Sequence, residues 1–529
     1  MTEGMKMKSS NNKFLALALV VLMCISLISC EGEKSDRLKL ASVTLTEEEY
    51  AFVCKKGNTL LIDSVNEFLA IIEENGELER IENAYFRGVG EKKGFEVTTE
   101  HVENTEDNFV VVTNCPFEPF EYMSTDGKIY GFDIEIAASY AEYHGLELVI
   151  KNINFNDIFV QVDAGYADIG MAGITVDAER AEAYDFTVGY FSTSQRIIVR
   201  SDNRDFDNCT TVSEAEEILR SLEGKSIGYQ SATTAMLYLN GDDVWGFEGF
   251  PNIEGKAYST ARVALNDLLN GNLYAVLLDE APAIAIVDAV NGEVGLNLVA
   301  KLNNFFETLS NEYYLSILLL GLWNTIKVAL VGLVIGTFIG TLIAIVKVAP
   351  KYKLIYRLLD KLCTIYTAVF RGTPIVAQLL IIYYVVIPAL DMSVDALTVG
   401  MIAFGMNSGA YVSEIMRGGI SSVDKGQMEA GRALGLSYST TMIKIVIPQA
   451  VKNILPTLGN ELISLIKETS VLSFIAVYDL YKALLDVGMV KYDSMIPYLM
   501  MGLIYIVLVL IISAVIKIIE RRFAVSDRN

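Results

Sequence analysis

The sequence predicts a two-lobed α/β domain followed by an all-α transmembrane domain. The chain has 529 residues, of which 52% are hydrophobic and only 20% are charged, and its mean hydropathy of +0.37 is too apolar for an ordinary soluble enzyme. The two halves differ in charge, because residues 310–529 carry 19 basic and 14 acidic side chains, whereas residues 1–309 carry 23 and 51. We therefore expect an acidic, water-exposed domain joined to a membrane domain.

The composition also excludes some classes of function. Phosphate backbones repel an acidic domain that no basic stretch interrupts, so we expect no nucleic acid partner. Two histidines leave little material for zinc chemistry, and we expect no metal, no cofactor and no catalytic residues. Gly224-Lys225-Ser226 is no phosphate-binding loop, because Leu219 stands where such a loop has its first glycine. The chain is therefore not predicted to be an enzyme, and any ATP would be hydrolysed on another subunit.

Residues 1–30 are predicted to be an export signal. Lysines precede an apolar run from Phe14 to Ile28, whose length suits a signal peptide better than a spanning helix. The run ends in Leu27-Ile28-Ser29-Cys30, which resembles the bacterial lipoprotein box, in which the cysteine is lipidated and becomes the new N-terminus. An uncleaved anchor and a plain signal are the alternatives. We expect residues 31–305 to form an extracytoplasmic domain.

The second half contains uncharged apolar runs, each near the length that crosses a bilayer as a helix. Four are clear: Val328–Val346, Gly372–Leu390, Ala396–Ser413 and Ile496–Ile516. A fifth run, Ile454–Val477, is the weakest because charged residues interrupt it. We expect five membrane helices within residues 312–529, in the cytoplasmic membrane.

Charged residues set the expected orientation, because cytoplasmic loops collect lysine and arginine. The loops alternate between basic and acidic, and the C-terminal residues Lys517, Arg521 and Arg522 predict a cytoplasmic C-terminus. Five spans then leave the acidic domain outside, in agreement with the export signal. An ionisable residue at membrane depth is costly, so some are candidates for function, with pairing between helices as the alternative. They are Arg371, Glu461, Lys467 and Glu468.

The stretch EAGRALGLSYSTTMIKIVIP, residues 429–448, predicts a short helix, a turn at Gly435 and a second amphipathic segment. It resembles the EAA loop of ABC importer permeases, with Glu429, Ala430 and Gly435 at the family spacing and Gly431 in place of the usual alanine. RGTPIVAQLLIIYY and KETSVLSF further resemble the polar amino acid branch of that family. The resemblance implies that the loop 417–452 couples the chain to two copies of an ATPase subunit.

Residues 109–200 alternate short β-rich runs with helical patterns, which predicts an α/β lobe with a parallel sheet. In such sheets, ligands bind at the carboxyl ends of the strands. Arg180 follows one predicted strand, DIGMAG, and its guanidinium suits a carboxylate. This lobe is therefore expected to hold part of a ligand site.

Three motifs of this lobe resemble the type II periplasmic binding proteins for polar amino acids: PFEPFEY from Pro116, GFDIEIA from Gly131, and the G-x-T-x-x-x-x-R loop that ends at Arg180. By that resemblance, Arg180 takes the α-carboxylate of the ligand. Thr175 and the Gly173 carbonyl would face the α-ammonium. Phe117 and Phe155 would enclose its aliphatic part.

A second lobe begins near residue 205 and contains GKSIGYQSATTA, which resembles the family's second ligand segment. Gln230, Thr233 and Thr234 fit the pattern, but Ala232 replaces a glycine, and a left-handed backbone there would be strained. By resemblance, Asp279 holds the α-ammonium. We expect residues 109–200 and 270–305 to form the first lobe and hinge and residues 201–270 to form the second lobe.

Residues 43–86 resemble the segment that usually ends such binding domains, although here they come first. A circular permutation would explain this order, since domain termini commonly lie close together. The alternative is the remnant of a truncated tandem copy.

Together the resemblances predict the binding and permease subunit of an ABC importer for a polar amino acid, acting as a homodimer because the pathway needs two five-helix halves. A different permease partner stays open. The alternative function is an amino-acid-gated channel or a membrane-anchored sensor, although no TVGYG-like filter is present. Asn114 and Gln230 favour a neutral polar ligand such as glutamine or cystine. A carboxylate at position 114 would favour a cationic amino acid, and so would Glu118 if it faced the site.

Overall fold

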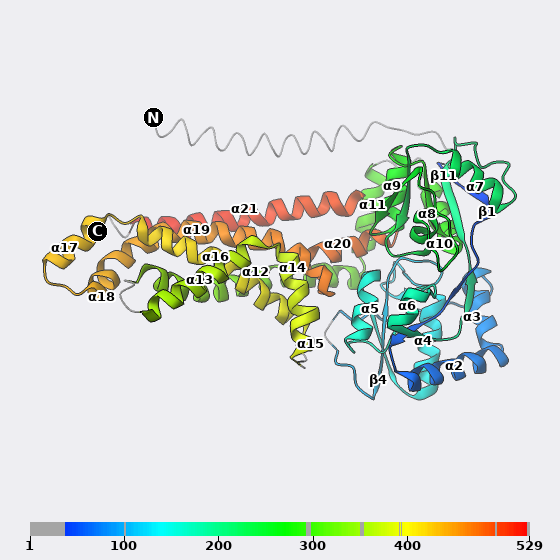
Figure 1. Cartoon of the computed structure of the whole chain (residues 1–529), viewed down its shortest axis with the longest axis horizontal. Coiled ribbons are helices and arrows are strands. Elements are labelled where there is room, and N and C mark those ends of the chain that lie inside the picture. The colour runs from blue at the N-terminus through cyan, green and yellow to red at the C-terminus, as the bar shows by residue number, and fades with distance from the viewer. Residues whose placement is uncertain are drawn as a thin grey trace.

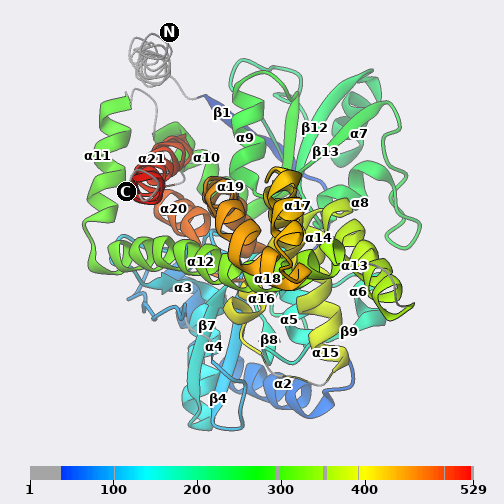
Figure 2. The same cartoon turned by 90° about the vertical axis from the view of Figure 1, so that its left-hand side faces the viewer.

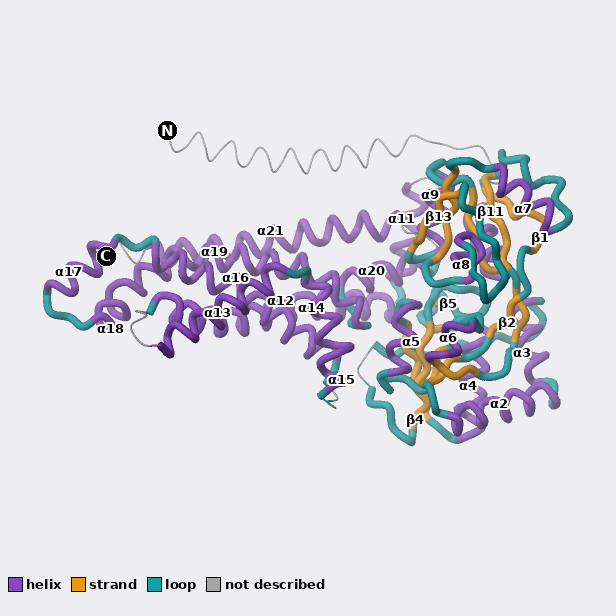
Figure 3. Tube along the Cα trace, in the orientation of Figure 1, coloured by secondary structure: helices purple, strands orange, loops and turns teal. Residues whose placement is uncertain are grey.

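The structure, a computed structural model, describes residues 37–525 apart from 100–101, 293–297, 350–353, 391, 393, 492 and 494. The predicted signal peptide and the lipidation site at Cys30 lie outside the described residues. A mixed α/β domain sits at one end of an elongated bundle of helices (Figure 1). Figure 3 shows that the strands gather at this end and that the rest of the chain is helical. This is the predicted division into two domains.

Lobe one is built on a five-stranded sheet of order β7-β4-β8-β3-β9, in which β4 runs parallel to β7 and β8 while β3 runs antiparallel to β8 and β9. All but the first residue of β4 are buried, as expected of a central strand that is covered on both faces. The strands are β3 (Val53–Lys55), β4 (Asn108–Thr113), β7 (Glu147–Asn152), β8 (Ile169–Gly170) and β9 (Tyr184–Phe186), beside the hairpin β5 (Tyr122–Met123) and β6 (Ile129–Tyr130). The helices are α2 (Thr59–Glu74), α3 (Glu77–Phe86), α4 (Phe132–His144), α5 (Phe155–Asp163) and α6 (Ala178–Ala183).

Lobe two is built on a second five-stranded sheet, of order β1-β11-β14-β12-β13. Its strands are β1 (Leu38–Thr44), β11 (Gln195–Arg200), β12 (Lys225–Gln230), β13 (Ile253–Tyr258) and β14 (Ala275–Asp279). Its helices are α7 (Val212–Ser221), α8 (Thr234–Asn240), α9 (Ala261–Leu269) and α10 (Glu280–Gly292). The expected lobe boundaries were wrong here, because β11, β14 and α10 belong to lobe two. All five residues of β14 are buried in this lobe, so this apolar strand is part of the core of lobe two and not of lobe one.

Two antiparallel strands cross between the lobes and form the hinge. They are β2 (Glu48–Tyr50) and β10 (Phe191–Thr193), with Tyr50 opposite Phe191 and Glu48 opposite Thr193. The chain therefore passes from lobe two to lobe one through β2 and returns through β10.

The N-terminal segment completes both lobes. β1 is an edge strand of lobe two, β3 lies inside the lobe-one sheet, and α2 buries Val65, Phe68, Leu69 and Ile72 in the lobe-one core with the spacing of an amphipathic helix. A tandem remnant would leave surplus elements outside the two sheets, whereas this segment takes a place in each. The segment therefore takes the places in both sheets that a circular permutation would give it.

The helical domain begins at α11, earlier than the expected start at residue 312. Phe305 of α11 is buried against Tyr314 and Leu480 of the membrane helices, so this apolar packing draws α11 away from the binding domain. The helices are α11 (Leu298–Leu309), α12 (Glu312–Val348), α13 (Leu354–Gly372), α14 (Ile375–Ile381), η2 (Ile382–Val386), α15 (Ile387–Ala389), α16 (Ala396–Ser421), α17 (Lys425–Ala433), α18 (Tyr438–Thr441), η3 (Met442–Val446), α19 (Ile447–Glu468), η4 (Thr469–Ile475), α20 (Leu480–Met489) and α21 (Met495–Val525).

By length and composition, α12 and α21 could each cross a membrane, and the bent pair α13 with α14–α15 could form a third span among the described residues. The predicted run Gly372–Leu390 forms α14, η2 and α15, and a sharp bend lies at its start. α13 ends at Gly372, Pro374 caps α14, and the two helices meet at 108° because a residue before proline avoids the helical conformation. α16, expected to be a clear span, is not among these helices, and it buries polar residues such as Asn407 and Ser408 inside the bundle.

Small residues let α12 and α16 pack closely. A Cβ at Gly336 would lie 2.7 Å from the Ser408 side chain, and one at Gly340 would lie 2.7 Å from Val412. The hydrophobic effect does not drive helices together inside a membrane. Close backbone approach of this kind stabilises a helix pair there through van der Waals packing. At the end of the bundle far from the binding domain, α17 and α18 form the predicted loop (Figures 1 and 2).

Candidate functional site

A narrow cavity of about 20 Å³ lies between the two lobes, and the ten predicted ligand residues all line it. Asn114, Phe117, Phe155, Gly173, Thr175 and Arg180 come from lobe one, and Gln230, Thr233, Thr234 and Asp279 come from lobe two. Most lie just beyond the carboxyl ends of the parallel strands β4, β7, β8, β12 and β14, where loops from both sheets converge. Glu121, Ala172 and Ala232 also line the cavity and were missed from the sequence.

Arg180 is held in place by contacts with both lobes. Its Nε lies 2.9 Å from Asp177 Oδ2, and its Nη1 donates a hydrogen bond of 3.0 Å to the carbonyl of Thr175. Its Nη2 donates to the carbonyl of Ala232 on lobe two. Burial lowers the pKa of Arg180, although a guanidinium keeps its proton in proteins. The cavity therefore has one fixed cation that can receive a carboxylate.

Ala232 adopts the left-handed conformation with φ of 60°. The predicted strain is thus present, because a Cβ disfavours this region by about 1 kcal/mol. The conformation directs the Ala232 carbonyl to Arg180, so the strained residue takes part in joining the two lobes.

Asp279 belongs to a buried hydrogen-bond network that includes the hinge. Gln195 Nε2 donates to Asp279 Oδ1 over 2.9 Å and to Glu48 Oε1 over 3.1 Å, and Thr175 Oγ1 donates to Glu48 Oε2 over 2.9 Å. Burial, and after it the charge of Glu48, raise the pKa of Asp279 to about 7. Glu48 and Gln195 were not predicted, because nothing in a lone sequence shows that hinge residues reach the site.

The geometry of the ligand loop depends on Asp133, the aspartate of the GFD motif. The amide of Gly173 donates to Asp133 Oδ2 over 3.0 Å, and the hydroxyl of Tyr190 donates to Oδ1 over 2.6 Å. Gly173 has φ of 52°, and a Cβ there would lie 2.5 Å from the ring of Phe117. Glycine is therefore required for the loop to pass beside this ring.

Glu121 lines the cavity with a side chain that is fully buried. Neither carboxylate oxygen has a hydrogen-bond partner among the described residues. Burial, and after it the charge of Asp133, raise its pKa well above the ordinary value. Glu118, the glutamate of the PFEPFEY motif expected to favour a cationic ligand if it faced the site, does not line the cavity. Phe117 and Glu121 pair in an isolated antiparallel β-bridge. The tight turn that places Phe117 in the site therefore also places Glu121 there, and such a turn is the signal that could have identified Glu121.

Lobe one contacts the membrane helices directly. Tyr314 of α12 donates to the carbonyl of Ser124, and Tyr166 stacks on Tyr383 with ring centroids 5.6 Å apart. Asn154 donates to the carbonyl of Ser473 over 3.4 Å. Below this contact, a larger cavity of about 370 Å³ lies between lobe one and α12, α16 and η2.

The predicted coupling loop is exposed at the far end of the bundle. Glu429 and Ala430 lie on the exposed surface of α17, and Gly435 makes the following turn with φ of 83°. A Cβ at Gly431 would lie 2.4 Å from the methyl group of Thr441, so glycine in place of the usual alanine lets α17 and α18 approach. Leu434 beside the turn is 82% exposed, which suits contact with another protein.

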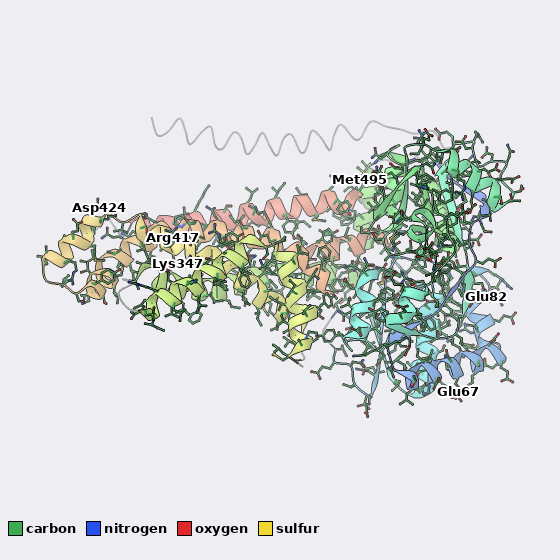
Figure 4. All side chains as sticks on the ribbon, in the orientation of Figure 1. Glu67, Glu82, Lys347, Arg417, Asp424 and Met495 are labelled. Carbon is green, nitrogen blue, oxygen red and sulfur yellow. The ribbon has the colours of Figure 1, made fainter. Side chains whose placement is uncertain are left out.

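An ion cluster joins the helices next to this loop. Glu414 lies 2.9 Å from Lys347 Nζ and 2.6 Å from Arg417 Nη2. Figure 4 shows Lys347 and Arg417 toward the loop end of the bundle, with Asp424, the N-cap of α17, beyond them.

The other charged residues predicted at membrane depth have separate surroundings. Arg371 lies over the ring of Tyr411, and Glu461 accepts a hydrogen bond of 2.9 Å from Ser408. Lys467 and Glu468 are exposed in the single chain. Among the described residues no cluster of His, Cys, Asp or Glu could hold a metal ion.

Two protein families match the chain. "Binding-protein-dependent transport system inner membrane component" matches residues 332–525, and "Bacterial extracellular solute-binding proteins, family 3" matches residues 109–416. The second match begins after the segment β1–α3, which this chain places first.

Similar proteins match the membrane half. The arginine transport system permease protein ArtQ of Bacillus subtilis (strain 168) is 38% identical over 39% of this chain and 92% of its own length. The putative glutamine transport system permease protein GlnP of Rickettsia prowazekii (strain Madrid E) is 39% identical over 41% of this chain and 97% of its own length. A crystal structure of an amino acid ABC transporter with histidines shares 38% identity and covers 40% of this chain and 97% of its own, with a TM-score of 0.37. These relatives are transport components rather than enzymes.

Proposed function

We propose that this chain, which belongs to the binding-protein-dependent transport family and fuses the binding and permease components of an amino acid ABC importer, takes up a polar amino acid with energy from a separate ATPase subunit. The observation that carries the proposal is the cavity between the lobes, where the ten predicted ligand residues meet. Its lining combines one guanidinium, carboxylates and aromatic rings, which are the groups that a polar amino acid requires.

Opposite lobes hold opposite ends of the amino acid. Arg180 of lobe one receives the α-carboxylate, and Asp279 of lobe two receives the α-ammonium, so one zwitterion joins the lobes. Phe117 and Phe155 cover the apolar part of the ligand. Binding between two hinged lobes favours the closed form.

The closed domain delivers the amino acid to the permease. The cavity beneath lobe one provides room at the outer mouth of the membrane helices. Attachment within one chain raises the local concentration of the binding domain at this mouth. The exposed helix α17, with Glu429 and Ala430, docks on the ATPase. A movement of α17 is transmitted to α16 and α12 through the ion cluster at Glu414.

The finer arrangement follows from the sequence. Five spans, an extracytoplasmic binding domain and a cytoplasmic C-terminus agree with the loop charges. Residues 1–30 act as a signal peptide, with lipidation at Cys30. Two copies of the chain form the pathway with two ATPase subunits, since a cyclic dimer of five-helix halves closes it.

The test measures binding of labelled polar amino acids to the purified full chain in lipid nanodiscs. We expect micromolar or tighter binding that Arg180→Ala weakens by at least about 100-fold, because the substitution leaves a buried carboxylate unpaired. Arg220→Ala is the matched control, since Arg220 pairs with Glu248 on the surface of lobe two. Equal binding to both variants, or no binding of any amino acid to folded protein, would overturn the proposal.

A further inference from the structure

The side chain of Glu121 is the feature of the cavity that the binding of a simple zwitterion does not explain. It is fully buried, it lines the cavity, and neither of its oxygens has a hydrogen-bond partner in the described part of the chain. A buried carboxylate without a partner is costly, and native proteins keep one where function requires it. Glu121 therefore points to a group that the ligand brings.

The charges that line the cavity identify that group. The lining has one cation, Arg180, and two carboxylates, Asp279 and Glu121. A zwitterionic amino acid satisfies Arg180 with its carboxylate and Asp279 with its ammonium. Glu121 is then left over, and Asp133 beside it adds more negative potential. A second positive charge on the ligand would favour the ionised form of Glu121, which burial and Asp133 disfavour when no cation is bound.

The other residues near Glu121 offer acceptors and aromatic faces. Asn114 uses its Nδ2 to donate a hydrogen bond of 2.7 Å to the carbonyl of Ile153, which leaves its oxygen, an acceptor, for the ligand. Phe117 lies on the same turn as Glu121, and aromatic rings attract cations. Acceptors, a carboxylate and a ring are the groups that receive a guanidinium or an ammonium.

We propose that the site takes a cationic amino acid, with Glu121 as the residue that pairs with the side-chain guanidinium or ammonium. This inference rests on the proposed function and sharpens it. It differs from the expectation of a neutral ligand, which came from Asn114 and Gln230. The carboxylate was expected at position 114, whereas Glu121 lies seven residues further along the chain.

The experiment titrates the full chain in lipid nanodiscs with arginine, lysine and glutamine. We expect arginine or lysine to bind at least about 10-fold more tightly than glutamine, because a neutral ligand leaves Glu121 unpaired. Glu121→Gln should weaken binding of the cation by at least about 100-fold and change glutamine binding less than about 3-fold. Glu118→Gln is the matched control, since Glu118 belongs to the same motif but does not line the cavity, and it should change neither affinity.

The outcomes separate this inference from the proposed function. Tight binding of glutamine but not of arginine or lysine to the wild-type chain would overturn the cationic ligand and leave the amino acid site standing. The same holds if Glu121→Gln retains full affinity for the cation. Absence of binding for every amino acid would overturn both. The wild-type preference is measured without any variant, so the test does not depend on the folding of Glu121→Gln.

Discussion

The two lobes of the binding domain contribute unequally to the site and to its attachment. Lobe one contacts the membrane helices through Tyr314 and Tyr383 and carries Arg180. Lobe two supplies Asp279 and is joined to lobe one by the hinge strands β2 and β10. The difference shows that lobe one is the half of the site with direct contacts to the helical domain.

Among substitutions that keep the charged ligand contacts, breaking the ligand loop of lobe one should have the largest effect. Gly173→Ala places a Cβ 2.5 Å from the ring of Phe117, on a residue with φ of 52°. We expect ligand affinity to fall by about 10- to 100-fold, because overpacking costs about 1–3 kcal/mol. Gly145→Ala is the matched control on the same lobe, since its φ is 68° but nothing lies within 4 Å of the new Cβ. Equal losses in both variants, measured by calorimetric titration, would mean that backbone strain alone matters.

Separating lobe one from the permease should affect transport and spare binding. Gly127→Ala places a Cβ 2.5 Å from Tyr313 of α12, while Gly57→Ala, with a similar φ of 86°, meets nothing within 4 Å. We expect Gly127→Ala to lower uptake into proteoliposomes that contain the ATPase subunit by about tenfold. Ligand affinity should stay within about twofold of wild type in both variants. Unchanged uptake would show that lobe one need not stay docked.

The pH dependence of binding tests the contribution of lobe two. Burial and Glu48 raise the pKa of Asp279 to about 7. The ligand ammonium requires the ionised carboxylate, so protons compete with the ligand below that pKa. We expect affinity to weaken by about tenfold between pH 8 and pH 6, as linkage predicts for one proton. The raised pKa of Glu121 acts in the same direction for a cationic ligand, and Glu121→Gln separates the two groups. A flat profile in Asp279→Asn with Glu121→Gln, compared with a sloping wild type, would assign the dependence to these residues.

The smallest expected effect is at the strained contact of lobe two. Ala232 has φ of 60°, which glycine adopts without strain. Ala232→Gly should raise the midpoint of thermal unfolding by about 2 °C. A lower midpoint would mean that the side chain of Ala232 stabilises the lobe by more than its backbone costs.

The residues singled out from the sequence as ligand contacts line one cavity because their motifs lie at or just beyond the ends of strands. Arg180 and Asp279 lie on different lobes, nearly 100 residues apart, and the family resemblance singled out both. Glu121 could not be placed, because two glutamates stand three residues apart in PFEPFEY and only the turn geometry decides which one faces the cavity.

The lobe boundaries and membrane helices were harder to predict for a related reason. β14 and α10 follow the other elements of lobe two in sequence and belong to the same lobe. The sequence of an apolar strand does not show which of two sheets the strand joins. The apolar run at Gly372–Leu390 looks continuous in composition, whereas Pro374 bends the helices at its start. Local patterns thus predict elements and loop ends, while long-range pairing decides their partners.

In the proposed function, one amino acid joins the lobes through Arg180 and Asp279. The most direct test compares the bound amino acid with its decarboxylated and deaminated analogues on the full chain, by titration of wild type, Arg180→Ala and Asp279→Asn. We predict that Arg180→Ala weakens binding of the amino acid but not of the decarboxylated analogue, and that Asp279→Asn weakens binding of the amino acid but not of the deaminated analogue. If both variants weakened every ligand by the same factor, the two residues would not hold the two ends of the ligand, and the account would be contradicted.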